Sequence, residues 1–219
     1  MRTLLILLLV GFTGLSTSHA DTRGLDVGMS LYKDNIDLNY SGELRETRLT
    51  NLDISWIELL GPAIYGGIEL GYLEFTQYSN PIPTGQTGSG GYLGLNLSFL
   101  MLDTRYFQLL TRLGYRYSYA THHSEGQSVD WDWHQGLIEL NGKLAFSDRL
   151  AMTLGVSAIA IDGRERADGT VTLAQPFKAD QPLSGHLGLQ LGLDPDSTIG
   201  IQVDVGSLRG GRLTIRRLF

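Results

Sequence analysis

The sequence predicts an all-β fold, an antiparallel up-and-down β-barrel of about ten strands that spans a membrane. Apolar side chains alternate with small or polar ones along most of the chain, as in LGLQLGL at 187–193. An export signal precedes these segments, and no later run of about 18 apolar residues could form a membrane-spanning helix. A membrane protein without such a helix has one other physical option, a closed barrel.

The residues 1–20 have the features of a cleaved secretory signal peptide. Arg2 supplies a positive charge, 4–10 are apolar, and Ser18 and Ala20 are small residues at the cleavage positions, so we expect cleavage before Asp21. The remaining 21–219 are enough for a single barrel domain. The chain has no cysteine, so neither disulfides nor a thiolate metal site is available.

Ten segments carry the alternation, and each is expected to be a strand. Their outward apolar residues lie within 25–31, 52–56, 64–72, 93–101, 107–119, 138–146, 150–158, 183–193, 199–205 and 213–219. Tight turns near 61–62, 102–105, 147–149 and 194–196 alternate with longer polar stretches at 33–48, 77–88, 121–130 and 162–182. This alternation predicts short turns at one rim and long loops at the other. The stretch 206–211 is expected to be a tight turn on the long-loop side. If it is not a turn, the number of strands becomes eight or twelve.

The composition of the polar face predicts which side of the barrel faces lipid. A soluble β protein, such as a lipocalin-like barrel or a sandwich, would expose Lys and Glu there, whereas this face is largely Gly, Ser, Asn and Gln. Aromatic residues near strand ends suit the two lipid–water boundaries. They are Trp56, Tyr72, Phe99, Phe107, Tyr117, Tyr119, Trp131 and Phe146.

Charged residues on the polar face are expected to line the lumen. This set is Glu69, Arg112, Arg116, Glu139, Lys143 and Asp204, with Arg212 and Arg216 on the same face of the last strand. A barrel of this size has a narrow interior, where buried charges must pair or hydrogen-bond. We therefore expect a plug of ion pairs, and a narrow charged pore is the alternative.

The segment 130–134, DWDWH, is the strongest candidate for chemistry. Asp132 and His134 are two residues apart and share a strand face, so the carboxylate could orient a general base, and Ser124 could be a nucleophile. Alternatively, Trp131 and Trp133 face lipid headgroups, which requires a bulge near 135–136 to keep the next strand in phase.

The terminus LTIRRLF, with the alternation and the signal, resembles the bacterial outer-membrane β-barrel proteins. In that family a C-terminal Phe with apolar residues at alternate positions is the signal for the barrel-assembly machinery, which Leu213, Ile215 and Phe219 match and Arg217 does not. The resemblance implies the outer membrane of a Gram-negative bacterium. The Asp-x-His pair at 132–134 also resembles the omptin proteases, but no second acidic pair accompanies it.

These features favour a structural or ligand- and partner-binding role over a narrow channel, and both over a hydrolase of lipid or peptide at the rim. The expected partners are membrane lipid, lipopolysaccharide and the assembly machinery, and a monomer is expected. A net charge of −6 without a basic patch argues against nucleic acid. No cofactor or metal is expected, because His122, His123 and His134 lack an enforcing ligand spacing.

Overall fold

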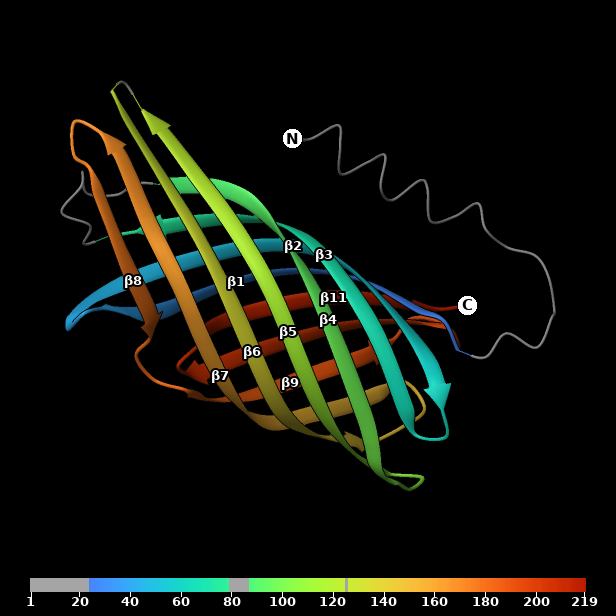
Figure 1. Ribbon diagram of the computed structural model, residues 1–219. Helices are drawn as coiled ribbons and strands as arrows, with labels where there is room; N and C mark the ends of the chain where they lie inside the picture. Colours follow the sequence, from blue (N-terminus) through green and yellow to red (C-terminus); the bar gives the residue numbers. More distant parts are fainter. Residues whose placement is uncertain (1–23, 79–86, 125) are drawn as a thin grey trace.

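The computed structural model describes residues 24–78, 87–124 and 126–219, which form one antiparallel sheet (Figure 1). The expected signal peptide at 1–20 and its cleavage site before Asp21 lie outside the described residues. So does most of the polar stretch at 77–88. Within the described part of the chain, no helix has the length and hydropathy needed to cross a bilayer.

The strands follow one another along the chain with short connections between them. In order they are β1 (Asp26–Tyr40), β2 (Glu43–Gly61), β3 (Ile64–Gln77), β4 (Thr87–Asp103), β5 (Phe107–Ser124), β6 (Gln127–Ala145), β7 (Leu150–Gly169), β8 (Leu173–Ala179), β9 (Leu183–Gly192), β10 (Ser197–Gly206) and β11 (Arg209–Leu218).

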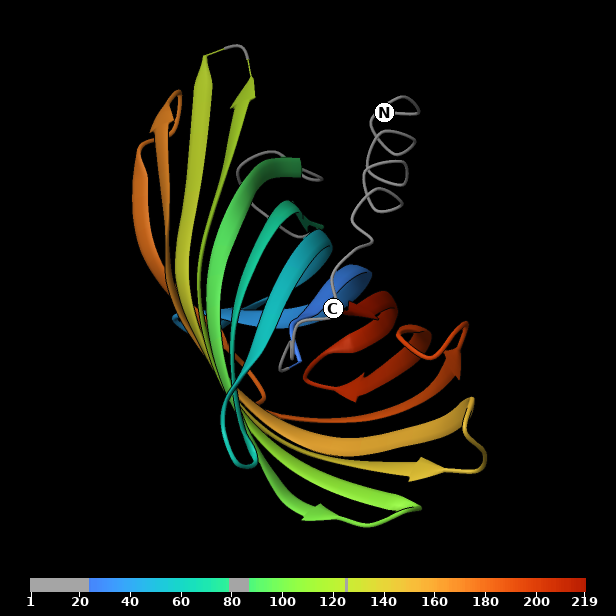
Figure 2. The ribbon, with the colours of Figure 1, turned by 90° about the vertical axis from the view of Figure 1, so that its right-hand side faces the viewer.

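The sheet closes into a barrel because the first and last strands pair. Strands β1 to β7 each pair with the next strand in sequence. The first half of β7, from Leu150 to Ala158, pairs with β9, which pairs with β10, and β10 pairs with β11. The β1–β11 register then runs from Asp26 opposite Leu218 to Asn35 opposite Arg209. We call this closed set, β1–β7 with β9–β11, the membrane ring. It contains the ten strands that were predicted, and the curl of the sheet is visible in Figure 2.

The strand β8 builds a second, narrower ring. It pairs with the second half of β7, from Asp162 to Ala167, and its C-terminal end pairs with β1 at Leu38 and Asn39. Above the membrane ring, β8 therefore takes the place of β9, β10 and β11. We call this set, β1–β8, the cap ring. Its β5–β6 and β7–β8 hairpins project furthest at the upper left of Figure 1.

The prediction of long loops at 33–48, 121–130 and 162–182 was wrong. The stretch 33–48 is two strands joined by a two-residue turn, in which Ser41 and Gly42 both have positive φ, at 56° and 105°. Such turns match the twist of a hairpin. The stretch 121–130 belongs to β5 and β6, and 162–182 contains the end of β7 and all of β8. Their polar residues are the water-facing side of strands, such as Lys33 opposite the buried Ile36 face.

The turn between β10 and β11 has the tight form that the sequence predicts. Strand β10 ends at Gly206 and β11 begins at Arg209, so the strand count of the membrane ring stays at ten. Ser184 accepts a hydrogen bond at its hydroxyl from the backbone N–H of Leu208, at 2.8 Å, which holds this turn against β9.

An apolar band surrounds the outside of the membrane ring. Leu70, Leu187 and Val203 are 57–60% exposed, and comparable side chains occur on every strand of this ring. Monomeric soluble proteins rarely expose a continuous apolar surface of this extent. The outward placement also holds for the exposed aromatic residues Trp56, Tyr72, Tyr117, Tyr119 and Phe146.

Trp131 and Trp133 are the exception, and their predicted position at the lipid boundary was wrong. They are 0% and 3% exposed. Strand β6 pairs with β5 and with β7 without a register shift from Gln127 to Leu144, so there is no bulge near 135–136. With unbroken alternation, both tryptophans share the inward face with Glu139.

Candidate functional site: a polar chamber beneath an apolar cap

The membrane ring encloses a cavity of about 360 Å³, which we call the chamber. Its wall includes Glu69, Arg112, Arg116, Glu139, Lys143 and Asp204, together with Arg212 and Arg216. Inward glycines make room for these side chains. A Cβ on Gly94 would overlap Glu69, and one on Gly71 would overlap the Tyr92 ring. Glycine in a strand interior often marks such a close approach.

Glu69 is the centre of the charge network on one side of the chamber. Arg116 donates to Glu69 Oε1 from Nη2 at 2.6 Å and from Nε at 2.9 Å. Arg112 Nη2 lies 3.5 Å from the other carboxylate oxygen, Oε2. Charge-assisted hydrogen bonds as short as the two from Arg116 are roughly twice as strong as neutral ones. The β3 carboxylate is thereby tied to two arginines of β5.

Two tyrosines extend this network across the lumen. Arg116 Nη1 donates to the Tyr32 hydroxyl at 2.5 Å, and the Tyr32 and Tyr92 hydroxyls lie 3.2 Å apart. Tyr92 in turn donates to Asp53 Oδ2 at 3.1 Å. The alternation of the sequence places these residues inward, but uncharged tyrosines gave no reason to single them out. The structure adds them to the lumen site.

The opposite wall has fewer direct contacts. Asn141 Nδ2 lies 3.2 Å from Glu139 Oε1 and 3.1 Å from His186 Nε2. Arg216 Nη1 is 3.6 Å from Asp26 Oδ2. Arg212 lies over the Tyr32 ring, 4.7 Å from its centroid. This wall therefore holds several cations that are only loosely bound by protein groups.

Apolar side chains fill the interior of the cap ring. The Phe75 and Trp131 ring centroids are 4.8 Å apart, and those of Tyr40 and Phe177 are 5.2 Å apart. A ring of eight strands is just wide enough for side chains to fill. We call this filled interior the cap; it contains Ile36, Leu38, Tyr40, Leu73, Phe75, Ala120, Val129, Trp131, Trp133, Ile159, Ile161, Ala167 and Phe177.

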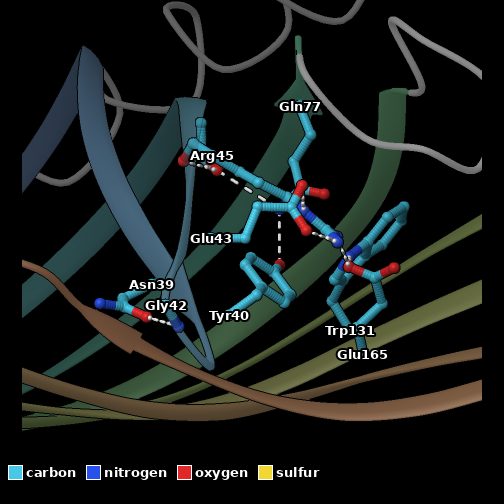
Figure 3. Close-up of polar contacts among 9 residues, drawn as sticks. Asn39, Tyr40, Gly42, Glu43, Arg45, Gln77, Trp131 and Glu165 are labelled. Atoms are coloured by element: carbon cyan, nitrogen blue, oxygen red, sulfur yellow. Dashed lines mark hydrogen bonds and ion pairs between the residues drawn. The ribbon is translucent and has the colours of Figure 1, made fainter.

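A buried ion pair lies within the cap. Arg45 Nη1 is 3.3 Å from Glu165 Oε2, and both residues are at most 1% exposed. Trp131 Nε1 donates to the same oxygen at 3.1 Å, and the guanidinium lies 4.1 Å from the Tyr40 centroid. Figure 3 shows the Arg45 side chain reaching from β2 toward Glu165, with Glu43 beside it. The pair joins β2 to β7 through the middle of the cap.

The chamber ends where the cap begins. Leu49, Leu137 and Leu208 line the chamber and also pack against the cap. At the other end, lining residues next to the short turns, such as Ser98 and Gln108, are only half-buried. The chamber is therefore accessible from the short-turn end and closed by apolar side chains at the other.

Three ionisable groups beyond the apolar band have shifted pKa values: Asp37 and Tyr40 of the cap ring, and Arg209 at the start of β11. Arg209 donates from Nη1 and Nη2 to Asp37, at 2.8 and 3.0 Å, and these bonds hold the pKa of the Asp37 carboxyl below its usual value. The same contact raises the pKa of Arg209. Burial inside the cap raises the pKa of the Tyr40 hydroxyl.

Asp132 and His134 lie on the outer surface of the barrel, away from the chamber. Asp132 forms an ion pair with Arg166 at 3.3 Å, and His134 Nδ1 is 2.6 Å from the Tyr115 hydroxyl. His134 pairs across the strands with Tyr117, and Ser124 is seven residues further along β5. At about 3.3 Å per residue this places Ser124 roughly 23 Å from His134 along the strand. The structure does not bring the three together.

The C-terminal strand keeps its apolar residues on the lipid side. Leu213 and Ile215 are 40% and 38% exposed, and both face outward. Arg217 lies with its guanidinium 5.6 Å from the Phe219 ring centroid. The backbone N–H of Phe219 donates to Leu25 at 2.8 Å, which ties the last residue to the start of β1.

Comparison with solved structures fits this geometry. The translocator domain of the autotransporter NalP from Neisseria meningitidis is similar at a TM-score of 0.53 and 12% identity, over 100% of this chain and 95% of that one. The β domain of the Bordetella autotransporter BrkA gives 0.54 at 12% identity, over 90% and 100%. The chain has the fold of the bacterial outer-membrane β-barrels. No protein-family model and no curated protein matches its sequence.

Proposed function

We propose that this outer-membrane-type barrel is a capped barrel, embedded in the outer membrane of a Gram-negative bacterium, with a structural or partner-binding role and not that of an open channel. The observation that carries the proposal is the cap. Its aromatic side chains fill the narrow ring at one end, where Trp131 is 0% exposed. A hydrated path through the barrel would need these side chains to move.

The apolar band supports the membrane location, and the strand ends support an orientation. Outer-membrane barrels have short turns on the periplasmic side. In that orientation the chamber opens to the periplasm and the cap ring projects outside the cell. The exposed aromatic residues near the band edges, such as Tyr117 and Trp56, suit contacts with lipid and lipopolysaccharide headgroups.

The cap ring offers a partner a broad strand surface. On the outward face, Asp130 and Asp132 of β6 lie opposite Arg166 and Arg164 of β7, and Asp132 forms an ion pair with Arg166. Leu213 and Ile215 on the outward face of β11 suit recognition by the barrel-assembly machinery. We propose that the chain assembles through this strand and works as a monomer.

Conductance in planar lipid bilayers tests the capped barrel directly. The folded wild-type protein is expected to give no steady conductance, and Trp131→Ala is expected to leak because it removes one of the two buried tryptophans of the cap. Trp56→Ala, which removes an exposed tryptophan from the lipid face, is the matched control and should stay closed. Folding of each variant is checked by its electrophoretic mobility before and after heating. A steady wild-type conductance would refute the proposal in favour of a channel.

A further inference from the structure

The arginines that line the chamber differ in how many hydrogen bonds and ion pairs they form with the protein. Arg116 donates a close hydrogen bond from each of its three nitrogens, with donor–acceptor distances of 2.5, 2.6 and 2.9 Å. Arg212 forms no hydrogen bond and no ion pair with any described residue, and its Nε is buried without a partner. A guanidinium carries five N–H donors, so Arg212 keeps nearly all of its capacity free.

Two further arginines border the same space. Arg112 has a buried Nε without a hydrogen-bond partner, and its one ion pair, to Glu69, is 3.5 Å long. Among the described residues, Arg216 has one ion pair, to Asp26 at 3.6 Å. Buried donors without partners are uncommon in native proteins, and each calls for an explanation such as a bound ion or water.

These three arginines line a side cavity of about 130 Å³, which adjoins the chamber and is lined by residues of β5, β6 and β7 as well as of β9, β10 and β11. The one carboxylate in its lining is Glu139. The hydroxyls of Thr198 and Thr214 add uncharged hydrogen-bonding groups. The pocket therefore carries a surplus of positive charge, with hydroxyl groups placed among the cations.

We propose that this side cavity binds a phosphate group. The planar fork of arginine fits the oxygens of phosphate, and three such cations around one small space favour a compact oxyanion over an extended polyanion. Other carboxylates of the chamber, Asp34, Asp53, Glu69 and Asp204, lie outside the lining of the side cavity, which limits the bound anion to the space among the three arginines. Access from the short-turn end makes a small molecule, inorganic phosphate or a phosphomonoester, the ligand.

Titration calorimetry of the folded full-length barrel in detergent, at low ionic strength, tests this with inorganic phosphate. Saturable binding is expected, and Arg212→Gln should weaken it about tenfold or more, the loss expected for a charge-assisted contact. Arg209→Gln removes the same charge from the outward face of the same strand and is the matched control, with expected affinity within about twofold of wild type.

A second variant keeps the test decisive if Arg212→Gln does not fold. Gln190→Glu is nearly isosteric, lies in the lining of the cavity and adds a negative charge, so it must also weaken binding. Glycerol 3-phosphate serves as a second probe: tighter binding than inorganic phosphate assigns the site to phosphomonoesters, and equal binding assigns it to free phosphate.

Two results would overturn the phosphate site: no saturable binding by folded wild-type protein, or equal weakening by Arg212→Gln and Arg209→Gln. The inference uses the chamber of the proposed capped barrel but not its impermeability. A conducting barrel that binds phosphate through Arg212 would refute the cap alone, and a closed barrel without binding would refute this site alone.

Discussion

Arg45 is the residue whose charge fits least with its surroundings. Its side chain crosses an apolar interior to reach Glu165, and both residues are at most 1% exposed. Burying two charges costs several kcal/mol each, and their attraction offsets this only with good geometry and further hydrogen bonds. Trp131, Glu43 and the Tyr40 ring supply such contacts. The pair therefore fixes how β2, β6 and β7 meet within the cap.

Arg45→Met is expected to lower the free energy of unfolding by about 3–5 kcal/mol, because it removes a positive charge beside a buried carboxylate. Urea unfolding in lipid vesicles, followed by tryptophan fluorescence, measures the change. Glu43→Gln is the control: Glu43 contacts the same arginine but is 53% exposed at its side chain, so its loss should cost no more than about 1 kcal/mol. Equal costs for the two variants would contradict this account.

The Asp37–Arg209 pair predicts a dependence of stability on pH. The pKa of Asp37 is lower in the folded protein than its ordinary value of about 3.9, so the stabilisation is complete above about pH 4 and is lost as the pH falls through the folded pKa. At pH 7 Asp37→Asn should reduce stability by at most about 1 kcal/mol, since the pair is 32% and 44% exposed.

Unfolding midpoints at several pH values check this pair. The difference between wild type and Asp37→Asn is expected to shrink as the pH drops below about 4. Arg209→Gln should reproduce the same pattern, and combining both substitutions should add little, because they remove one interaction. A difference that stays constant over this pH range argues against the assigned role of Asp37.

Individual lumen residues were predictable because the side-chain period of a strand is two. Once Leu140 is outward, Glu139 and Lys143 must be inward, and the structure places them in the chamber wall. The same rule carried back along β6 puts Trp131 inside, but its aromatic character suggested the lipid boundary instead. The continuous pairing of β6 with β5 and β7 therefore decides the position of Trp131, and the general preference of tryptophan for the lipid–water boundary does not. Which inward side chains form ion pairs or hydrogen bonds with one another depends on the distances between strands across the barrel, and a single sequence does not give these distances.

The shortest strand, β8, closes the narrow end of the barrel. Its seven residues, Leu173–Ala179, replace three strands of the membrane ring and narrow the barrel. Phe177 anchors it, packing 5.2 Å from Tyr40 and 6.4 Å from Trp133, centroid to centroid. Gly163 of β7 leaves the space that this ring occupies, since a Cβ there would overlap it.

Gly163→Ala is therefore expected to destabilise the cap by about 1–3 kcal/mol, the usual cost of overpacking. Gly136→Ala is the matched control on the neighbouring strand, because nothing lies within 4 Å of the added Cβ. The temperature at which each folded barrel loses its fast electrophoretic mobility compares the two. If both variants melt with the wild type, β8 does not depend on this packing.

The sequence did not predict β8, and the reason is physical. Its residues, LAQPFKA, contain a proline and too few alternating apolar positions to stand out from a polar loop. The pairing partner on β1 is far away in the chain, and only the closed geometry brings it near. The strands of the membrane ring, by contrast, carry a strong alternation because lipid demands an apolar residue at every second position.

For the whole molecule, the apolar band, the short turns and the cap ring together give an orientation that labelling can test. The chain has no cysteine, so a single introduced thiol reports its own position. Thr170→Cys, in the β7–β8 turn, is expected to react with an impermeant maleimide on intact cells. Asp148→Cys, in the β6–β7 turn, should react only after the outer membrane is opened. The reverse pattern would show that the barrel is inserted the other way.

Both closures of the barrel fall on one strand. β1 meets β11 from Asp26 to Asn35 and β8 near its other end, at Leu38 and Asn39. The cap ring is therefore built entirely from residues Asp26 to Ala179, whereas the membrane ring needs the last residues of the chain. The strand pairings that close the cap ring therefore do not depend on β9, β10 or β11, although Leu208 of the β10–β11 turn packs against the cap. The two ends of one barrel are closed by different parts of the chain.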